Sequence, residues 1–304
     1  MKKSCTESIS VALATYNGEK FLREQLDSLL NQTLPFSELV ICDDCSSDAT
    51  LSILQEYAAR DSRIKVIANE QNLGFRRNFE KAIRLCEGDL IALCDQDDVW
   101  LPEHLAVLAG NMEGCLLTVG ASIITDSEGN TDGVRLSFLK NYETRSGNPE
   151  DVFRFVMFYQ NPFQGASMMM RREFRAYALP VPSSVAYHDV WFVHLASILR
   201  EFRFVDIPVT LYRLHGANTS GNHKRTPRLR TLIGHTLHRT LTNNRTELAL
   251  ELSKLRRVIP SESLPLLEDA LRYYSSRSLS RRLSNLIFEL KNYKSIYGTR
   301  QSRK

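Results

Sequence analysis

Strand-length apolar runs alternate with amphipathic helical stretches along the first third of the chain, and this alternation constrains the fold most strongly. Four such runs are present, at residues 9–14, 39–42, 64–67 and 89–94. Strands joined by helical crossovers pair in parallel, and helices cover both faces of a parallel sheet. The sequence therefore predicts an α/β fold for this part of the chain.

The pattern changes beyond this part. Four short strands bounded by turns are expected, at residues 116–125, 166–170, 204–205 and 209–212. A helix is expected at 185–199, and the pattern is helical from Pro227 to the end of the chain. We therefore expect a mixed sheet within residues 1–226, followed by a helical region over residues 227–304.

These two parts differ in charge. Residues 227–304 contain 16 Lys and Arg against 6 Asp and Glu, a net charge of +10, whereas residues 1–226 have a net charge of −6. A basic region of this kind suits an anionic membrane surface or a phosphorylated carrier, or is simply a solvated helical face. It carries few aromatic residues and no recognisable DNA or RNA motif, so we expect no nucleic-acid partner. Its helices could also pair between subunits in an oligomer.

Composition and targeting signals narrow the class of protein. No apolar run reaches the roughly 18–20 residues that a membrane-spanning helix requires. The basic N-terminus lacks the apolar core of a signal peptide. The six cysteines, including the Cys42-x-x-Cys45 pair, are expected to be structural thiols in a reducing compartment. The expected location is the cytoplasm, at the inner face of the membrane if the basic region binds anionic lipid.

Polar segments follow three of the predicted strands, at residues 15–19, 43–47 and 95–98. In a parallel sheet the ligand crevice lies at the carboxyl ends of the strands, so we expect these segments to line one site. Two of the segments are rich in aspartate, and their charges would repel one another without a cation. A hard divalent ion suits carboxylate oxygens, and its natural co-ligand is a phosphate.

Six sequence blocks carry a wider resemblance. They are VALATYNGE at 11–19, VICDDCSSD at 40–48, NLGFRRN at 72–78, ALCDQDDVWLP at 92–102, YHDVW at 187–191 and YRLHGAN at 212–218. In this order they resemble the inverting family 2 glycosyltransferases, which have the GT-A fold with a Rossmann-like nucleotide-binding half. The pattern is most similar to the bacterial rhamnosyltransferases and galactosyltransferases that build surface polysaccharide. The resemblance implies transfer from a UDP- or dTDP-linked sugar to a hydroxyl of a glycan or lipid-linked glycan.

The resemblance implies a site for the nucleoside diphosphate of the donor. Tyr16 would cover the base, and Asp44 would accept a hydrogen bond from a pyrimidine imide N–H while Asp43 braces the loop. Arg76 or Arg77 would neutralise the diphosphate. The other residues expected to contact the nucleotide are Thr15, Asn17, Glu19, Asn72, Asp95 and Arg213.

The resemblance also implies a divalent cofactor, Mg²⁺ or Mn²⁺, and a site for the sugars. Asp97 would bind the ion, and His215 would complete the metal site, since imidazole suits Mn²⁺ better than Mg²⁺. For His215, an ordinary polar surface role is the alternative. The donor or acceptor sugar would contact Asp98, Trp100, Gln164, Gly165, His188 and Trp191.

Inverting sugar transfer needs a carboxylate that takes the proton of the acceptor hydroxyl as it attacks. The resemblance assigns this role to Asp189, which stands at the start of a predicted helix, where the helix dipole favours a negative charge. Helix capping alone is the alternative role for this residue.

Two rival functions were weighed against glycosyl transfer. A sugar-nucleotide pyrophosphorylase needs a glycine-rich phosphate loop after the first strand, and residues 14–18 contain a single glycine. An inactive relative that only binds nucleotide sugar or glycan would keep the fold without turnover. The presence of all the expected acids favours the enzyme over this second alternative.

Overall fold

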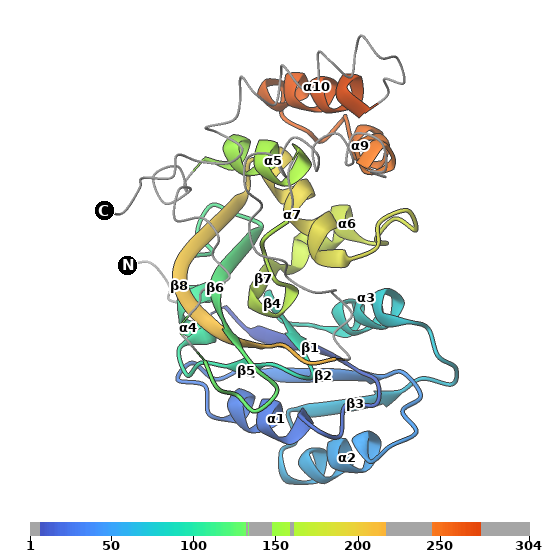
Figure 1. Ribbon diagram of the computed structural model, residues 1–304, viewed down its shortest axis with the longest axis vertical. Helices are drawn as coiled ribbons and strands as arrows, with labels where there is room; N and C mark the ends of the chain where they lie inside the picture. Colours follow the sequence, from blue (N-terminus) through green and yellow to red (C-terminus); the bar gives the residue numbers. More distant parts are fainter. Residues whose placement is uncertain (1–6, 132, 134–147, 159–160, 217–244, 275–304) are drawn as a thin grey trace.

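The computed structural model describes residues 7–131, 133, 148–158, 161–216 and 245–274. A mixed eight-stranded sheet runs through it in the order β3-β2-β1-β4-β7-β6-β8-β5. Figure 1 shows that this sheet is strongly curled, with α1 and α2 below its first strands and α5, α9 and α10 at the opposite end of the molecule. The mixed sheet predicted from the sequence is therefore confirmed.

The first half of the sheet is parallel, as predicted. Its strands are β1 (Ile9–Thr15), β2 (Glu38–Asp43), β3 (Ile64–Ala68) and β4 (Leu90–Asp95). The crossover helices are α1 (Leu22–Leu30), α2 (Thr50–Arg60) and α3 (Phe75–Leu85). Side chains of β1 alternate between two cores, with Val11 packed on the side of α1 and α2 and Ala12 on the side of α3. Both faces of the strands are thus buried, which is why these runs are apolar throughout.

The second half of the sheet mixes strand directions. It contains β5 (Val99–Trp100), β6 (Leu117–Thr125), β7 (Met168–Arg171) and β8 (Phe202–Arg213). Strand β7 is antiparallel to both β4 and β6, whereas β8 runs parallel to β6 and antiparallel to β5. The helices of this half are α4 (His104–Ala109), α5 (Pro149–Phe158), α6 (Arg175–Ala178) and α7 (His188–Ile198).

Two strand predictions need correction. The strand expected at 166–170 begins at Met168, because Gly165–Ser167 forms a turn of 3₁₀-helix. The two short strands expected around Pro208 are one strand, β8. Pro208 pairs with Ala121 at a shift in the β6–β8 register, where its missing N–H does not interrupt a regular ladder.

The C-terminal helices α9 (Arg245–Lys254) and α10 (Leu264–Tyr274) pack against α5. The Arg245 guanidinium donates to the Val156 carbonyl at 2.8 Å, and the Tyr274 hydroxyl donates to the Met157 carbonyl at 2.6 Å. Leu252 of α9 belongs to the same hydrophobic cluster as α5 and α7. This part of the basic region therefore shares one core with the sheet domain.

Much of the basic region lies outside the described residues, together with the predicted boundary between 226 and 227. In the ranges that the structure describes, no helix combines the length and the apolar character needed to span a membrane.

Two buried histidines give the fold a defined sensitivity to acid. His104 stacks on Trp100 with ring centroids 3.6 Å apart and contacts the Val209 carbonyl through Nδ1 at 3.0 Å. His194 contacts the Val190 carbonyl through Nδ1 at 2.6 Å. Burial lowers the pKa of both imidazoles to about 3, so both are neutral in the folded protein at neutral pH.

We expect each of these histidines to contribute free energy of unfolding that is lost as the pH drops below the ordinary histidine pKa of about 6.5, while the raised pKa values of the buried acids Asp95 and Asp189 act in the opposite direction. The unfolded chain takes up protons that the folded protein excludes, at roughly 1.4 kcal/mol per pH unit for each histidine. Urea unfolding at about pH 7 and pH 5.5 isolates the share of His104 as the difference between the wild type and His104→Gln, because the buried acids are the same in both: the stability of the variant relative to the wild type should rise by about 1 kcal/mol between the two pH values. An identical pH dependence in the variant and the wild type would contradict the assignment.

Candidate active site

A cleft of about 760 Å³ opens at the carboxyl ends of β1 and β4. Strand β1 lies between β2 and β4, so the order of the strands reverses at β1. Open α/β sheets bind their ligands at such a reversal, outside the carboxyl ends of the strands. The predicted site residues that line the cleft are Thr15, Tyr16, Asn17, Asp44, Asn72, Asp95, Asp97, Gln164, Gly165, His188, Asp189 and His215. Those that do not line it are Glu19, Arg76, Arg77, Asp98, Trp100, Trp191 and Arg213.

The loop after β1 is held by the loop after β4. Gln96 accepts a hydrogen bond from the Tyr16 N–H at 2.8 Å and donates one to the Tyr16 carbonyl at 3.0 Å. The Gln96 amide occupies the space that a Cβ at Gly18 would need. The Tyr16 ring remains 51% exposed and forms part of the cleft wall. Gln96 thus has a bracing role that the sequence analysis did not assign.

The Asp44 carboxylate is buried and binds the loop that leads into α3. It accepts hydrogen bonds from Leu73 N–H at 2.7 Å, Gly74 N–H at 2.8 Å and the Asn69 amide at 2.8 Å. Gly74 has a φ of 78°, a conformation that favours glycine. Asp43 accepts hydrogen bonds from Thr15 and Ser46 within its own loop region, in line with the bracing role expected for it.

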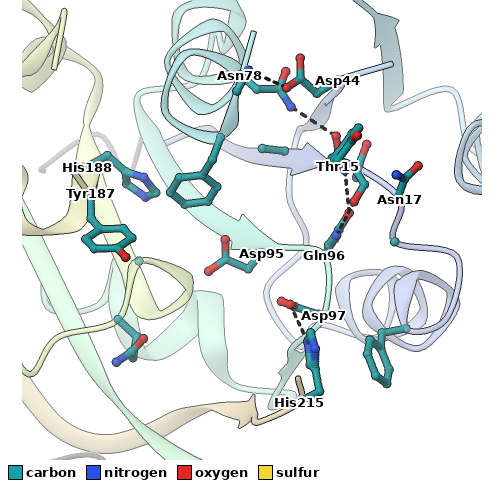
Figure 2. Close-up of a pocket in the computed structure, with 18 of the residues that line it drawn as sticks. Thr15, Asn17, Asp44, Asn78, Asp95, Gln96, Asp97, Tyr187, His188 and His215 are labelled. Atoms are coloured by element: carbon teal, nitrogen blue, oxygen red, sulfur yellow. Dashed lines mark hydrogen bonds and ion pairs between the residues drawn. The ribbon is translucent and has the colours of Figure 1, made fainter. Parts of the chain in front are cut away.

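Acidic side chains gather at the end of β4, as Figure 2 shows. Asp95 points into the cleft, and Asp97 contacts His215 with Oδ2 and Nε2 2.9 Å apart. The His215 ring packs on Phe21 with centroids 4.8 Å apart. Burial raises the pKa of Asp95, and the charges of Asp97 and Asp189 raise it further. A bound cation would relieve the repulsion among these acids.

The Asp97–His215 pair suits a divalent ion that also binds substrate. Its carboxylate and imidazole offer two ligand atoms on one wall of the cleft. Within the described part of the chain, no group of three or more His, Cys, Asp or Glu side chains forms a complete metal cage. Mg²⁺ and its relatives commonly use one or two protein carboxylates together with phosphate oxygens and water. The residues present therefore fit an ion that arrives with a phosphate ligand.

A separate carboxylate stands at the start of α7. Asp189 Oδ2 accepts a hydrogen bond from the Asn161 amide at 3.2 Å, and Oδ1 accepts one from the Val190 N–H at 2.7 Å. Burial raises the pKa of Asp189 to about 7. A carboxyl group with this pKa can exchange a proton near neutral pH, which is the property of a general base or acid.

His188 precedes Asp189 and is almost completely buried beside the cleft. Its ring packs against Phe75, Phe79 and Phe192, and neither ring nitrogen has a hydrogen-bond partner. A Cβ at Gly165 would lie 2.9 Å from Nε2, so glycine is required for the ring to sit there. Burial lowers the pKa of His188 to about 3, which keeps the ring neutral.

The two arginines predicted to face a diphosphate have other partners. Arg76 donates to the carbonyls of Ser183 at 3.1 Å and Val185 at 2.8 Å, and so anchors the segment before α7. Arg77 does not line the cleft and pairs with Glu80 at 3.4 Å. Lys20, which directly follows the first sequence block, lines the cleft instead, and its ammonium lies 4.8 Å from the centre of the Phe21 ring.

Five further predicted contact residues do not line the cleft. Arg213 pairs with Glu24 and donates to the Asp97 carbonyl at 3.0 Å, which helps fix the loop that carries Asp97. The remaining four bond elsewhere: Asp98 to the Arg213 N–H, Trp100 to the Ala166 carbonyl, Trp191 to the Ala178 carbonyl and Glu19 to the Ala49 N–H. Their expected contacts with nucleotide or sugar stay predictions, because none of the five side chains lines this cleft.

Comparison with known sequences identifies a family. The family model described as glycosyl transferase family 2 matches residues 10–177. An uncharacterized glycosyltransferase of Haemophilus influenzae is 30% identical over 233 residues, which cover 71% of this chain and 69% of that protein. The putative teichuronic acid biosynthesis glycosyltransferase TuaG of Bacillus subtilis is 37% identical over 97 residues, which cover 32% of this chain and only 38% of TuaG.

Comparison with solved structures identifies the fold. S. aureus TarS 1–349 aligns with a TM-score of 0.58 and 19% identity, covering 97% of this chain and 76% of that one. TarS has also been solved with UDP and with UDP-GlcNAc. The mannosyltransferase PcManGT of Pyrobaculum calidifontis, in complex with GDP-Man and Mn²⁺, aligns with a TM-score of 0.56 and 18% identity, covering 94% of this chain and 75% of that one.

These findings agree with one another. The family model covers more than half of the chain, and the curled mixed sheet is the one shared with TarS. The chain belongs to glycosyltransferase family 2 and has the GT-A fold.

Proposed function

We propose that this family 2 glycosyltransferase is an inverting, metal-assisted enzyme that moves a sugar from a UDP- or dTDP-linked donor to a glycan or lipid-linked glycan hydroxyl. One observation carries the proposal. The same cleft is lined by the loop after β1, by the Asp97–His215 pair and by Asp189, a carboxylate from a different element. Metal-assisted inverting transfer needs the first two to hold the donor nucleotide and the third to take the proton of the acceptor hydroxyl.

The loop after β1 is the proposed binding site for the base. The half-exposed Tyr16 ring can cover one face of a pyrimidine. Asp44 lines the cleft, and its Oδ2 atom accepts one protein hydrogen bond, from Gly74. Because a carboxylate oxygen has two lone pairs, Oδ2 can also accept the imide N–H of uracil or thymine. The UDP complexes of TarS support a pyrimidine donor, whereas the GDP-Man complex of PcManGT represents the alternative.

Asp97 and His215 are the proposed ligands of Mg²⁺ or Mn²⁺, together with oxygens of the donor diphosphate. A bound ion of this kind neutralises the charge that develops on a departing diphosphate. Lys20 is the protein cation that we propose on the same wall, in place of Arg76 and Arg77. The Mn²⁺ in the PcManGT complex supports the use of a divalent ion by this fold.

Asp189 is the proposed general base. The acceptor oxygen forms a bond to the anomeric carbon while the bond from that carbon to the diphosphate oxygen breaks. The acceptor proton passes to Asp189, and the electron pair of the broken bond leaves with the diphosphate. Attack and departure occur on opposite faces of the carbon, so a single displacement inverts its configuration. The relation to TuaG, whose name refers to teichuronic acid biosynthesis, supports a glycan acceptor.

Nucleotide binding tests the donor site first. We expect calorimetry to show that UDP or dTDP binds the intact protein more tightly with Mn²⁺ than without it. Asp97→Asn should weaken the metal-dependent binding by roughly tenfold or more, or about 1.4 kcal/mol, because it removes a charged ligand. Glu103→Gln is the matched control, since it removes one exposed acidic charge away from the cleft. A folded protein that binds neither nucleotide would overturn the donor assignment.

Turnover tests the base. We expect Asp189→Asn to bind nucleotide normally and to release nucleoside diphosphate from a panel of UDP- and dTDP-hexoses ~10²- to 10⁴-fold more slowly. In the wild type the rate should rise with pH through about 7, because the pKa of Asp189 is about 7 and the base acts when ionised. Undiminished turnover in Asp189→Asn would exclude this residue as the base. Nucleotide binding without any turnover by the wild type would favour the inactive relative.

A further inference from the structure

Asn161 contacts the Asp189 carboxylate in a fixed orientation. Its Oδ1 atom accepts a hydrogen bond from the Phe163 N–H at 3.2 Å, and its Nδ2 atom donates to the Phe163 carbonyl at 3.1 Å. A backbone N–H must face the amide oxygen, so this contact defines which end of the amide is Nδ2. The same Nδ2 atom donates to Asp189 Oδ2 at 3.2 Å. The amide therefore presents a donor, and not an acceptor, to the carboxylate.

The segment that carries this amide is anchored in the core. Phe163 is buried, and its ring packs against Phe202 and Phe204 of β8 with centroids 5.2 Å and 5.4 Å apart. Pro162 restricts the backbone of Asn161 to extended conformations. The Asn161 amide is bound to both the N–H and the carbonyl of Phe163, and Phe163 is packed on β8. The packing on β8 therefore sets the position of Nδ2. Asp189 itself is set by α7, so the hydrogen bond joins two separate elements.

The two donors to Asp189 hold different oxygens. Val190 N–H binds Oδ1 and the Asn161 amide binds Oδ2, which fixes the rotation of the carboxylate plane. Among the described residues, Asn161 is the side chain that donates to this carboxylate. The other titratable groups that line the cleft come from several elements: Tyr16 and Lys20 after β1, Asp44 after β2, Asp95 and Asp97 at the end of β4, Tyr187 and His188 beside Asp189, and Tyr212 and His215 at and after the end of β8. Ionised Asp95 and Asp97 cannot donate a hydrogen bond, and burial keeps His188 neutral. The side-chain hydrogen bond to the Asp189 carboxylate therefore comes from the neutral Asn161 amide.

We propose that Asn161 is a positioning residue for sugar transfer, which orients the Asp189 carboxylate toward the acceptor hydroxyl and stabilises its ionised form. This inference rests on the proposed function of Asp189 as the base. A hydrogen bond from an amide stabilises a carboxylate and opposes the effect of burial, which raises its pKa. Without Asn161, the carboxylate would turn about its side chain and hold a proton more tightly. Both changes slow proton transfer from the acceptor.

A carboxyl titration tests the inference without any substrate. The protein is labelled with ¹³C at the aspartate carboxyl carbon, and the Asp189 signal is identified by its loss in Asp189→Asn. We expect the midpoint of the Asp189 titration to rise by about one pH unit in Asn161→Ala. In Asn161→Asp it should rise further, because a second acid replaces the donor while its oxygen can still accept from Phe163. This second variant keeps the size of the side chain and guards against loss of folding.

Asn111→Ala is the matched control. Asn111 also uses its amide to bind a backbone carbonyl, that of Val107 at 2.8 Å, and it lies outside the cleft lining. Its removal should leave the Asp189 midpoint unchanged. An unchanged or lowered midpoint in both Asn161 variants would overturn the inference.

Turnover separates this inference from the proposed function. On donors that the wild type cleaves, we expect Asn161→Ala to slow nucleoside diphosphate release by ~10- to 100-fold with nucleotide affinity retained. If Asp189→Asn keeps full turnover, the base assignment fails, and the titration still decides whether Asn161 controls the carboxylate. If Asp189 is essential and Asn161→Ala behaves like Asn111→Ala, the positioning role fails alone.

Discussion

The pairing of β1 with β2 on one side and β4 on the other is the constraint on which the cleft depends. The parallel register sets Thr15 opposite Asp43 and Ala14 opposite Asp95, so the polar segments that follow all three strands begin at the same edge. Apolar side chains on both faces of these strands bury the pairing between two helical layers. Polar groups collect at the edge because burying them between the helical layers without hydrogen-bond partners would cost free energy.

The second half of the sheet completes the site over long distances in sequence. Strand β8 pairs with β5 directly after the Asp97 loop, and Arg213 at the end of β8 holds the Asp97 carbonyl. This return of the chain brings His215 to Asp97, 118 positions apart. Along this strand the register with β6 shifts at Pro208. The local pattern around Pro208 showed two short strands, because the pairing that joins them is not local.

The sequence predicted the elements of the first half and the cleft at their ends, since both follow from periodicity and strand direction. It placed Thr15 and Asp189 correctly at the cleft, but it also placed there several side chains that do not line it. Arg76 is captured by the Ser183 and Val185 carbonyls, which lie more than a hundred positions later and carry no motif. Asn161 was given no role from the sequence, because its contact with Asp189 depends on how β8 and α7 pack. Side-chain direction is a tertiary property, so a block of matching residues identifies a region and not a contact.

The cleft assigns different environments to acids that are chemically alike. Asp97 has an imidazole partner and stands beside Asp95, so its surroundings favour the binding of a cation. Asp189 has a neutral amide and a backbone N–H as partners and is largely withdrawn from water, so its surroundings favour exchange of a proton near neutral pH. In the proposed reaction, the first acid serves the leaving group and the second serves the nucleophile. Because Asp97 follows β4 and Asp189 belongs to α7, a cation bound at Asp97 would leave Asp189 as a separate base for the attacking hydroxyl.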